Sequence, residues 1–248
     1  MRRRGFLCLA CQAGIGLAAT SASAQHAHYG YTGKEGPADW GNLDPKWQAC
    51  SVGVNQSPVD LAGFIEARLP PLGIAYGDVG RELVNTGHSI QVNTAPGSTL
   101  AIDGKSFTLL QFHFHAPGEH TLDGKAFPLE AHLVHQAADG ELAVIGVFFT
   151  QGAPNDLLGL VTASLPLKED EKRAFGTPVP PAGLLPSNRD YIRYNGSLTT
   201  PPCSEGVRWL LMRQTMTASP AQIAAISGAL GFANNRPVQA VRARPILR

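Results

Sequence analysis

Short runs of alternating apolar and polar residues dominate the chain, and this period of two is typical of β-strands. Seven such runs lie near residues 82–93, 98–103, 106–115, 129–136, 141–150, 190–195 and 206–215. Helical signals are few. Asn155 favours a capped helix from Asp156 to Leu165, and Ser219-Pro220 opens an alanine-rich segment that runs to Leu230. The pattern predicts a mainly β single domain (α+β) with a few peripheral helices.

The remaining segments carry turn and loop signals. Residues 25–55 are rich in glycine, aromatic and polar side chains without a clear period, so they predict an irregular segment draped over the domain. The charged run 168–172 favours a solvated face, and the proline-rich residues 178–186 predict a surface loop. Asp103-Gly104 predicts a hairpin turn into the run 106–115. No repeat or composition break marks a second domain.

Histidines are concentrated between Gln111 and His135, which hold five of the eight in the chain. His113 and His115 are two residues apart, so on a strand both point to the same side, whereas on a helix they would diverge. Strand alternation places Phe107, Leu109 and Gln111 on the same face as these two histidines. The opposite face then carries Leu110, Phe112 and Phe114.

The run 129–136 brings a third histidine. It places Glu130, His132, Val134 and Gln136 on one face. If the two histidine faces coincide, His113, His115 and His132 supply three neutral nitrogens and leave a fourth tetrahedral position open, as in a catalytic Zn²⁺ site. A lone strand histidine is more often a hydrogen-bonded core residue, but three unpaired imidazoles on one buried face are costly without a metal, so the combination favours zinc.

The neighbours of these histidines have other predicted roles. Gln111 and Glu130 each lie two residues from a ligand on the same face, so both are candidates to accept a hydrogen bond from its second ring nitrogen. A surface glutamine or glutamate would satisfy the sequence equally well. His120 follows a loop and His135 has the opposite parity to His132, so the structural interpretation is favoured for both.

The first 24 residues predict an export signal. They contain three arginines, an apolar stretch from Gly5 to Ala19, and small residues before Gln25 that suit cleavage. The run from Arg3 to Leu7 also matches a twin-arginine signal, which implies a bacterial periplasm, although many ordinary signals begin with arginines. The apolar stretch is too short to favour a stable membrane span, and a lipoprotein site at Cys11 is a weaker alternative.

Cleavage after residue 24 changes both the charge and the cysteine count. Three arginines and no acidic residue are removed, so the formal charge falls from +1 to −2, and nothing indicates a nucleic-acid partner. Cys8 and Cys11 are removed as well. Cys50 and Cys203 then remain in an oxidising compartment and are expected to pair, the alternative being two free buried thiols.

The histidine stretch, with QFHFH at 111–115 and LEAHLVH at 129–135, resembles the α-class carbonic anhydrases. The resemblance spans nearly all of residues 25–248, which it identifies as a catalytic domain. It implies a large, twisted, mostly antiparallel sheet of about ten strands, with the metal at the base of a conical cleft. Further matching segments are GYTGKEGPADWG at 30–41, NQSPVDL at 55–61, NTGHSIQV at 85–92, LAVIGVFF at 142–149, NGSLTTPPCSEGVRW at 195–209 and NNRPVQ at 234–239.

This resemblance implies zinc-dependent, reversible hydration of CO₂ to bicarbonate and a proton. Zinc lowers the pKa of its water to about 7, for which carbonic anhydrase is the standard example, so that zinc-hydroxide can attack CO₂. Thr199 would accept the hydroxide proton and give its own to a buried Glu119, and Thr200 would help to bind bicarbonate. Without the resemblance, two threonines before two prolines more often form a polar turn.

The resemblance also implies a proton relay and an apolar wall. His88 matches the family's shuttle position, and an unperturbed histidine changes charge near neutral pH. The water between His88 and the metal would be ordered by Tyr31, Thr86 and Gln91, the last two standing where asparagine is commonest. The wall for CO₂ would be Val134, Val144, Leu198 and Trp209, although ordinary core residues would look the same.

Two other functions stay open at this stage. A catalytically silent binding module on the same fold is one, but such relatives lack one or more zinc histidines, and this chain keeps all three. A cupin-like metal dioxygenase is the other, because His113-x-His115-x₃-Glu119 would make Glu119 a metal ligand. The partners implied are CO₂ and bicarbonate, and a homodimer is open because exported relatives are often dimers.

Overall fold

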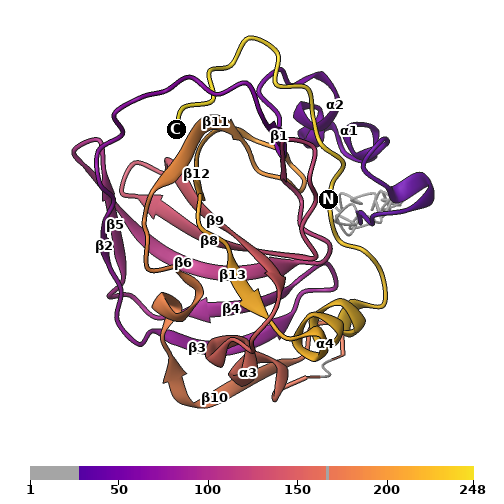
Figure 1. Ribbon diagram of the computed structural model, residues 1–248. Coiled ribbons are helices and arrows are strands. Elements are labelled where there is room, and N and C mark those ends of the chain that lie inside the picture. The colour runs from indigo at the N-terminus through magenta and orange to yellow at the C-terminus, as the bar shows by residue number, and fades with distance from the viewer. Residues whose placement is uncertain (1–27, 166–167) are drawn as a thin grey trace, which may run out of the picture.

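The computed structural model describes residues 28–165 and 168–248. A mixed sheet of 11 strands forms its centre (Figure 1). Across the sheet lie β10 (Lys172–Val179), β3 (Gly80–Asn85), β4 (Ile90–Thr94), β6 (Lys105–His115), β8 (Leu129–Ala137), β9 (Leu142–Gln151), β12 (Glu205–Met212) and β11 (Tyr191–Ser197). Off this path, β5 (Thr99–Ile102) joins β6 to β2 (Gly73–Ala75), and β13 (Met216–Ala218) pairs with β9.

Most neighbouring strands are antiparallel, as expected, but β9 is parallel to both β12 and β13. A separate two-stranded parallel ladder joins β1 (Asp60–Leu61) and β7 (Thr121–Leu122). The predicted hairpin between β5 and β6 is present, and its turn residues Asp103 and Gly104 both have positive φ. Such angles are typical of a two-residue hairpin turn, so the aspartate-glycine signal is confirmed.

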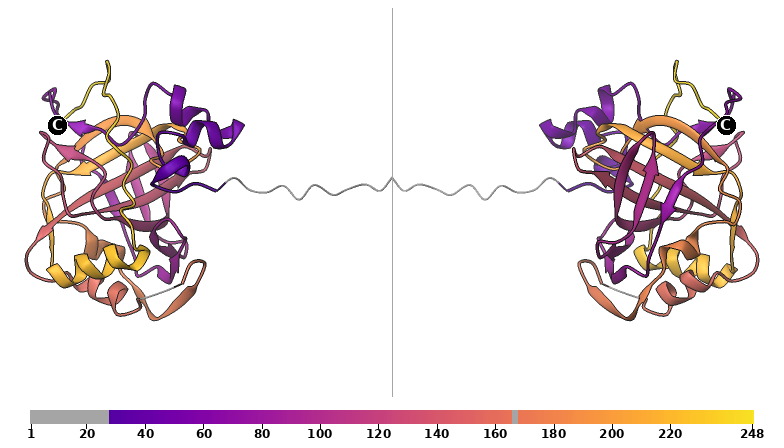
Figure 2. Two further views of the ribbon diagram at one scale, coloured as in Figure 1. Left: turned by 90° about the vertical axis from the view of Figure 1, so that its right-hand side faces the viewer. Right: turned by 90° about the vertical axis from the view of Figure 1, so that its left-hand side faces the viewer.

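The helices are short and lie around the sheet. Asn155 caps α3 (Asp156–Thr162) by accepting a hydrogen bond from the Leu158 amide, but this helix ends three residues before the predicted Leu165. A Ser219–Gln222 capping box begins α4 (Pro220–Leu230), as predicted. The N-terminal segment contains α1 (Trp40–Leu43), α2 (Ala49–Val52), η1 (Gly33–Glu35) and η2 (Pro45–Trp47), and η3 (Pro181–Leu184) precedes β11. Figure 2 shows α1 and α2 at the opposite end of the domain from α4.

The structure differs from the predicted strands in two places. The run 82–93 is not one strand, because a turn at residues 86–89 divides it into β3 and β4. The second is β10, a strand that was not predicted: the charged run 168–172 and the proline-rich loop 178–186 overlap it only at its two ends. β10 contains Pro178 but lies at the edge of the sheet, where one side of the strand needs no ladder hydrogen bonds.

A bulge in β6 changes which side chains share a face. The pairing of β6 with β8 skips Leu110, which is an extra residue in the ladder. Phe107 and Leu109 therefore lie in the same hydrophobic cluster as Phe112 and Phe114, and the expectation that they share the histidine face was wrong. A bulge moves the alternation by one residue, so side chains before and after it that have opposite parity reach the same side.

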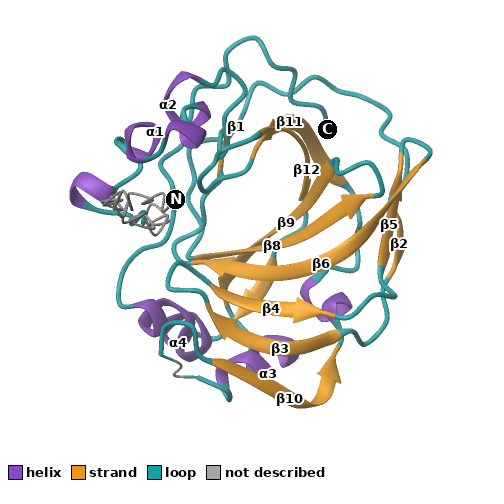
Figure 3. Ribbon diagram, turned by 180° about the vertical axis from the view of Figure 1, so that it is seen from behind, coloured by secondary structure: helices purple, strands orange, loops and turns teal. Residues whose placement is uncertain are grey.

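Apolar side chains fill both faces of the central strands. The larger cluster includes Phe112 and Leu133 and is completed by Leu158 of α3 and Ile226 of α4, which lie near the β3 and β10 end of the sheet (Figure 3). A second cluster includes Val144 and Trp209. The central strands are thus buried on both sides, which explains why β9 is an almost unbroken apolar run.

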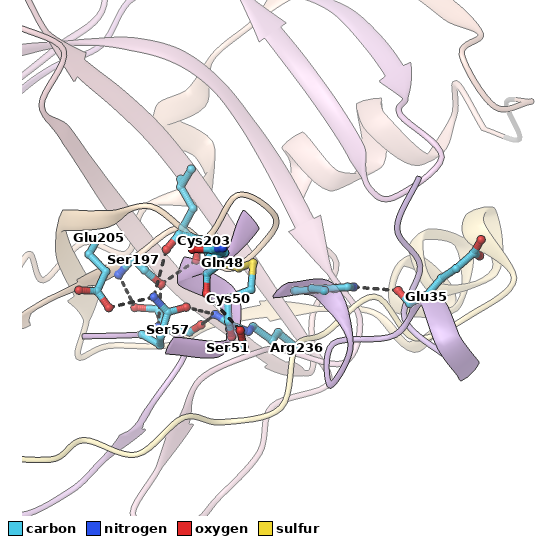
Figure 4. The surroundings of a disulfide bond; sticks show 12 residues. Glu35, Gln48, Cys50, Ser51, Ser57, Ser197, Cys203, Glu205 and Arg236 are labelled. Atoms are coloured by element: carbon cyan, nitrogen blue, oxygen red, sulfur yellow. Dashed lines mark hydrogen bonds between the residues drawn. A yellow bond between two sulfur atoms is a disulfide. The ribbon is translucent and has the colours of Figure 1, made fainter. Parts of the chain in front are cut away.

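The predicted disulfide is confirmed. Cys50 of α2 and Cys203, just before β12, are bonded across a sequence separation of 153 residues, in a small cluster with the buried Trp40 (Figure 4). Such a bond suits an oxidising compartment. The predicted export signal, residues 1–24, lies outside the described residues. Among the described helices, none is long and apolar enough to cross a membrane.

We expect the double substitution Cys50→Ser and Cys203→Ser to lower the free energy of unfolding. The bond closes a loop of 153 residues, for which the chain-entropy model gives an upper limit of about 5 kcal/mol. Urea unfolding of protein that begins at Gln25 measures the loss, and the reduced wild type is the control. Equal urea midpoints for the variant and the oxidised wild type would contradict the stabilising role.

Candidate metal centre

The register between β6 and β8 brings three histidines together. His113 lies directly opposite His132, and His115 lies opposite Glu130. The ring centroids are 5.3 Å apart for His113 and His132, 5.0 Å for His113 and His115, and 4.6 Å for His115 and His132. One nitrogen from each ring lies within 4.8 Å of the others. The two histidine faces therefore coincide.

The outer nitrogen of each ring is hydrogen-bonded to an acceptor. His113 Nδ1 donates to Gln111 Oε1 at 2.9 Å, and His132 Nε2 donates to Glu130 Oε1 at 2.8 Å. His115 Nδ1 donates to the backbone carbonyl of Asn234 at 2.7 Å. Because carbonyl and carboxylate oxygens only accept, these bonds assign the hydrogen of each neutral ring to its outer nitrogen. The lone pairs of His113 Nε2, His115 Nε2 and His132 Nδ1 are left for a metal.

Burial favours the neutral form that a metal requires. Burial, followed by the neighbouring His115 and His132, lowers the pKa of His113 well below its usual value. Burial also lowers the pKa of His115, against the opposing effect of Glu119. His115 Nε2 is buried and has no hydrogen-bond partner among the described residues. Three inward lone pairs, of which that on His115 Nε2 is fully buried and unpartnered, fit Zn²⁺.

Glu130 connects the histidine site to a second buried histidine. Its Oε1 accepts from both His132 and the His120 ring, and its Oε2 accepts from the amides of Glu119 and His120 at 2.8 Å. Burial alone would raise the pKa of Glu130, but its electrostatic interactions and hydrogen bonds with the His120 and His132 rings hold this pKa well below its usual value. His120 Nε2 in turn bonds to Tyr194 Oη at 2.7 Å. His120, Glu130 and His132 are therefore a satisfied hydrogen-bond network, although they too lie close enough to hold an ion.

His135, expected to be structural, lies away from the three rings. It bonds to Tyr76 Oη at 2.6 Å and to the carbonyl of Ala143 at 3.2 Å. Burial lowers the pKa of His135 to about 4, so this ring is neutral in the core.

Glu119 is buried beside the three rings. Its Oε1 accepts from the Arg236 amide at 2.8 Å, whereas Oε2 has no hydrogen-bond partner in the described part of the chain. Oε2 lies 3.5 Å from His115 Nε2 and 3.9 Å from His132 Nδ1. Thr199 is also buried, but among the described residues it makes no hydrogen bond to Glu119. Thr199 and Glu119 are thus both buried as expected, but the expected hydrogen bond between them is not formed.

A cavity of about 200 Å³ opens from the histidines. His88 lies on its wall, with its ring nitrogens 2.7 Å from the Tyr29 carbonyl and 3.2 Å from the Thr86 carbonyl. The lining residues are Tyr29, Tyr31, Thr86, His88, Ser89, Gln91, Gln111, His113, His115 and Thr200.

The four predicted wall residues gather next to the histidines. Val144 and Trp209 belong to the second hydrophobic cluster, and Val134 and Leu198 pack against it. The Trp209 ring lies 4.8 Å from the His132 ring, so this apolar cluster borders the metal site directly. They therefore lie where an apolar substrate would need them, while also serving as core.

Several residues around the site had no individual role in the sequence-based prediction. The Asn234 carbonyl and the Arg236 amide belong to NNRPVQ, which was noted only as a matching segment, because backbone groups leave no sequence signal. Tyr29 lies in an aperiodic stretch. Gly146 of β9 lies opposite His132, and a Cβ there would approach a Leu211 side-chain carbon to 2.2 Å, so a larger residue would force Leu211 to move. An isolated glycine in a strand is a usable signal of such close packing.

The comparisons agree with this geometry. The family model for eukaryotic-type carbonic anhydrases matches residues 35–248. A carbonic anhydrase of Pectobacterium carotovorum is 46% identical over 228 residues, which cover 92% of this chain and 93% of that protein. The α-carbonic anhydrase of Thermovibrio ammonificans, solved with the inhibitor sulfanilamide, is 45% identical, with a TM-score of 0.88 and coverage of 90% of this chain and 99% of its own.

One solved relative carries a different name. Dioscorin, crystallised in complex with ascorbate, is 32% identical, with a TM-score of 0.84 and coverage of 89% of this chain and 97% of its own. The fold is therefore shared with a protein whose name is not that of an anhydrase, so the likeness in fold alone does not assign the activity. Taken with the match over residues 35–248 and the identities above 40%, however, the comparisons show that this chain belongs to the eukaryotic-type carbonic anhydrase family.

Proposed function

We propose that this chain catalyses the reversible hydration of CO₂ to bicarbonate and a proton, with Zn²⁺ held by His113, His115 and His132. The observation that supports it most is the division of each ring into a bonded outer nitrogen and a free inner nitrogen. When bound there, zinc supplies a hydroxide nucleophile near neutral pH, as carbonic anhydrases in general illustrate.

The residues around the metal orient and enclose the reaction. In the proposed mechanism Thr199 would donate its hydroxyl hydrogen to Glu119 Oε2, which is buried and unpartnered in this structure, and so direct its own lone pair toward the nucleophile. Thr200 binds the bicarbonate product. The apolar cluster around Trp209 offers CO₂ a surface without competing hydrogen bonds. His88 accepts the proton at its ring and passes it to solvent. Tyr31 and Gln91 line the cavity that His88 shares with the metal-binding histidines.

The two alternatives are less well supported. A dioxygenase site would need Glu119 as a ligand, and its Oε2 does lie 3.5 Å from His115 Nε2, but the match over residues 35–248 is to the carbonic anhydrase family. A silent binding module would not need three histidines with their inner nitrogens free. Metal content and turnover distinguish all three functions.

Stopped-flow measurement with a pH indicator should show rapid CO₂ hydration by zinc-loaded protein that begins at Gln25. The activity should disappear with a zinc chelator and return when zinc is added, because the metal supplies the nucleophile. Folded, zinc-loaded protein that does not hydrate CO₂ would contradict the proposal and favour a binding module. Bound iron with oxygen-dependent turnover would instead favour the dioxygenase.

The same preparation tests the ligands. His132→Ala should lose zinc more severely than Glu130→Gln, since loss of an outer hydrogen-bond partner alone weakens metal affinity by about 10–100-fold. His28→Ala, which removes an exposed histidine, is the matched control and should retain zinc. Metal analysis after equilibrium dialysis gives the affinities. Full zinc occupancy in His132→Ala would remove this residue from the ligand set.

We expect Thr199→Ala to retain zinc but to slow hydration by about 100-fold or more, the usual effect of losing one aligned hydrogen-bonding group at a reaction centre. Thr199→Ser keeps the hydroxyl and should recover most of the rate. An alanine variant as fast as the wild type would show that Thr199 does not orient the nucleophile.

His88→Ala should lower kcat in weak buffer, by up to about 100-fold for loss of a proton-transfer group. Imidazole added to the solution should restore the rate, because it can carry the proton in place of the side chain. The comparison of weak and concentrated buffer is the internal control. If kcat of the variant does not depend on buffer, His88 is not the relay.

A further inference from the structure

A second cavity lies apart from the histidines and is lined by arginines. Its volume is about 340 Å³, within the range of about 300–1,000 Å³ that is typical of small-molecule sites. Among the described residues that line it, the basic ones are Arg68, Arg189, Arg213 and Arg248, and the acidic one is Asp190. It shares no described lining residue with the cavity beside the histidines, and we call it the arginine pocket.

Hydrogen bonds hold together the segments that form the arginine pocket. The amide of Arg213, which follows β12, donates to the Asp190 carbonyl at 2.9 Å. Tyr191 Oη, at the start of β11, donates to the Pro70 carbonyl at 2.8 Å. The C-terminal residues lie beside β11 (Figure 1). Segments that are far apart in the sequence thus meet in a fixed arrangement at the β11 end of the sheet.

Most of the guanidinium groups in the arginine pocket lack a partner. Arg248 Nε lies 2.7 Å from Glu66 Oε1, so this arginine is neutralised. Asp190 does not neutralise another, because its Oδ2 accepts a hydrogen bond from Asn188 Nδ2 at 3.1 Å. Within the described residues, three arginines of the pocket form neither an ion pair nor a side-chain hydrogen bond: Arg68, Arg189 and Arg213.

This convergence of cations is electrostatically unfavourable without an anion. A single exposed arginine is solvated by water and implies no ligand. Here several guanidinium groups repel one another around one cavity, in a chain that is net negative from residue 25 onward. Partial burial lowers the pKa of Arg189, against the opposing effect of Tyr76, so this cation has also lost part of its hydration. A bound anion would offset both costs.

The donors favour a phosphate group over a carboxylate. A guanidinium presents its N–H groups as a planar fork that pairs with two oxygens of either anion. A phosphate group, however, carries about −1.5 to −2 charge near neutral pH and three acceptor oxygens, so it can bind several guanidinium groups at once. A carboxylate has one charge and two oxygens.

We propose that the arginine pocket binds a phosphate group, in addition to the reaction at the histidines. A small phosphorylated molecule and the headgroup of an anionic phospholipid both present this group. The three unpartnered guanidinium groups hold it, with Arg189 as the partly desolvated member.

Titration calorimetry with inorganic phosphate tests the pocket on zinc-loaded protein that begins at Gln25, at low ionic strength and about pH 8, where phosphate is largely a dianion. We expect Arg189→Gln to raise the Kd for phosphate by about 10-fold, the usual effect of losing one charge-assisted hydrogen-bonding group. Arg189→Lys keeps the charge without the fork and should raise the Kd less. Arg213→Gln repeats the test if Arg189→Gln does not fold.

Two controls define the site and its ligand. Arg81→Gln removes an exposed arginine of β3 that lies outside the pocket, and it should leave the Kd unchanged. Acetate at the same ionic strength should bind at least about 10-fold more weakly than phosphate, because it has less charge and fewer acceptor oxygens. Sedimentation with vesicles of phosphatidylglycerol, compared with phosphatidylcholine, distinguishes a lipid headgroup from a free phosphorylated molecule.

Binding of phosphate or of phosphatidylglycerol vesicles that is weakened in Arg189→Gln but not in Arg81→Gln would support the site. Equal binding by these two variants would overturn it, and phosphate bound only at the metal would give that result. Acetate that binds as tightly as phosphate, or a protein that binds neither phosphate nor the vesicles, would also overturn it. None of these results depends on whether the chain hydrates CO₂.

Discussion

The pairing of β6 with β8 is the constraint on which the site depends. It places His113 opposite His132, and one residue of slippage would turn one of the two histidine faces toward the larger hydrophobic cluster. The bulge at Leu110 allows this register to coexist with a continuous core. On one side of it Phe107 packs into the core, and on the other Phe112 does so, although their numbers have opposite parity. The strand can therefore fill the core along its whole length and still present His113 and His115 on the opposite face.

Neutral, oriented imidazoles follow from a second requirement, that buried polar atoms find partners. Each ring bonds outward to a different kind of acceptor: an amide oxygen, a backbone carbonyl and a carboxylate. The carboxylate, Glu130, is the most expensive of these to bury, and it is stabilised by four hydrogen bonds from His120, His132 and two backbone amides. With the outer nitrogens committed, the inner lone pairs have a metal as their natural partner. Orientation of the site thus comes from the fold before any metal binds.

The sequence predicted the elements that depend on local pattern and missed those that depend on the partner strand. Alternation identified β6, β8 and β9, and the side chains of Gln111 and Glu130 could be assigned because they lie two residues from a histidine on the same strand. The bulge was not predictable, because it exists only relative to β8. The Asn234 carbonyl is 119 residues from His115 and is a backbone group, so its identity as an acceptor does not depend on its side chain. β10 was not predicted, because its charged residues and its proline are typical of a loop. It forms a strand by pairing with β3 at the edge of the sheet, where a proline is tolerated.

The aperiodic N-terminal segment has a role in the site that its lack of pattern concealed. It supplies Tyr29 and Tyr31 to the cavity, yet none of its residues from 28 onward belongs to the sheet. Its position is determined instead by the Cys50–Cys203 bond and by the buried Arg236, whose guanidinium bonds to the Cys50 carbonyl at 2.9 Å and lies 5.6 Å from the Trp40 ring.

Both attachments also lead to the candidate metal centre. Cys203 donates its amide to the Thr200 carbonyl at 2.9 Å, and Arg236 donates its amide to Glu119. The threonine loop, the buried glutamate and the wall that carries Tyr29 are therefore tied to one another outside the sheet. A change that loosened this attachment would disturb the threonine loop, Glu119 and the aromatic wall of the cavity, while leaving the three histidines in place on β6 and β8.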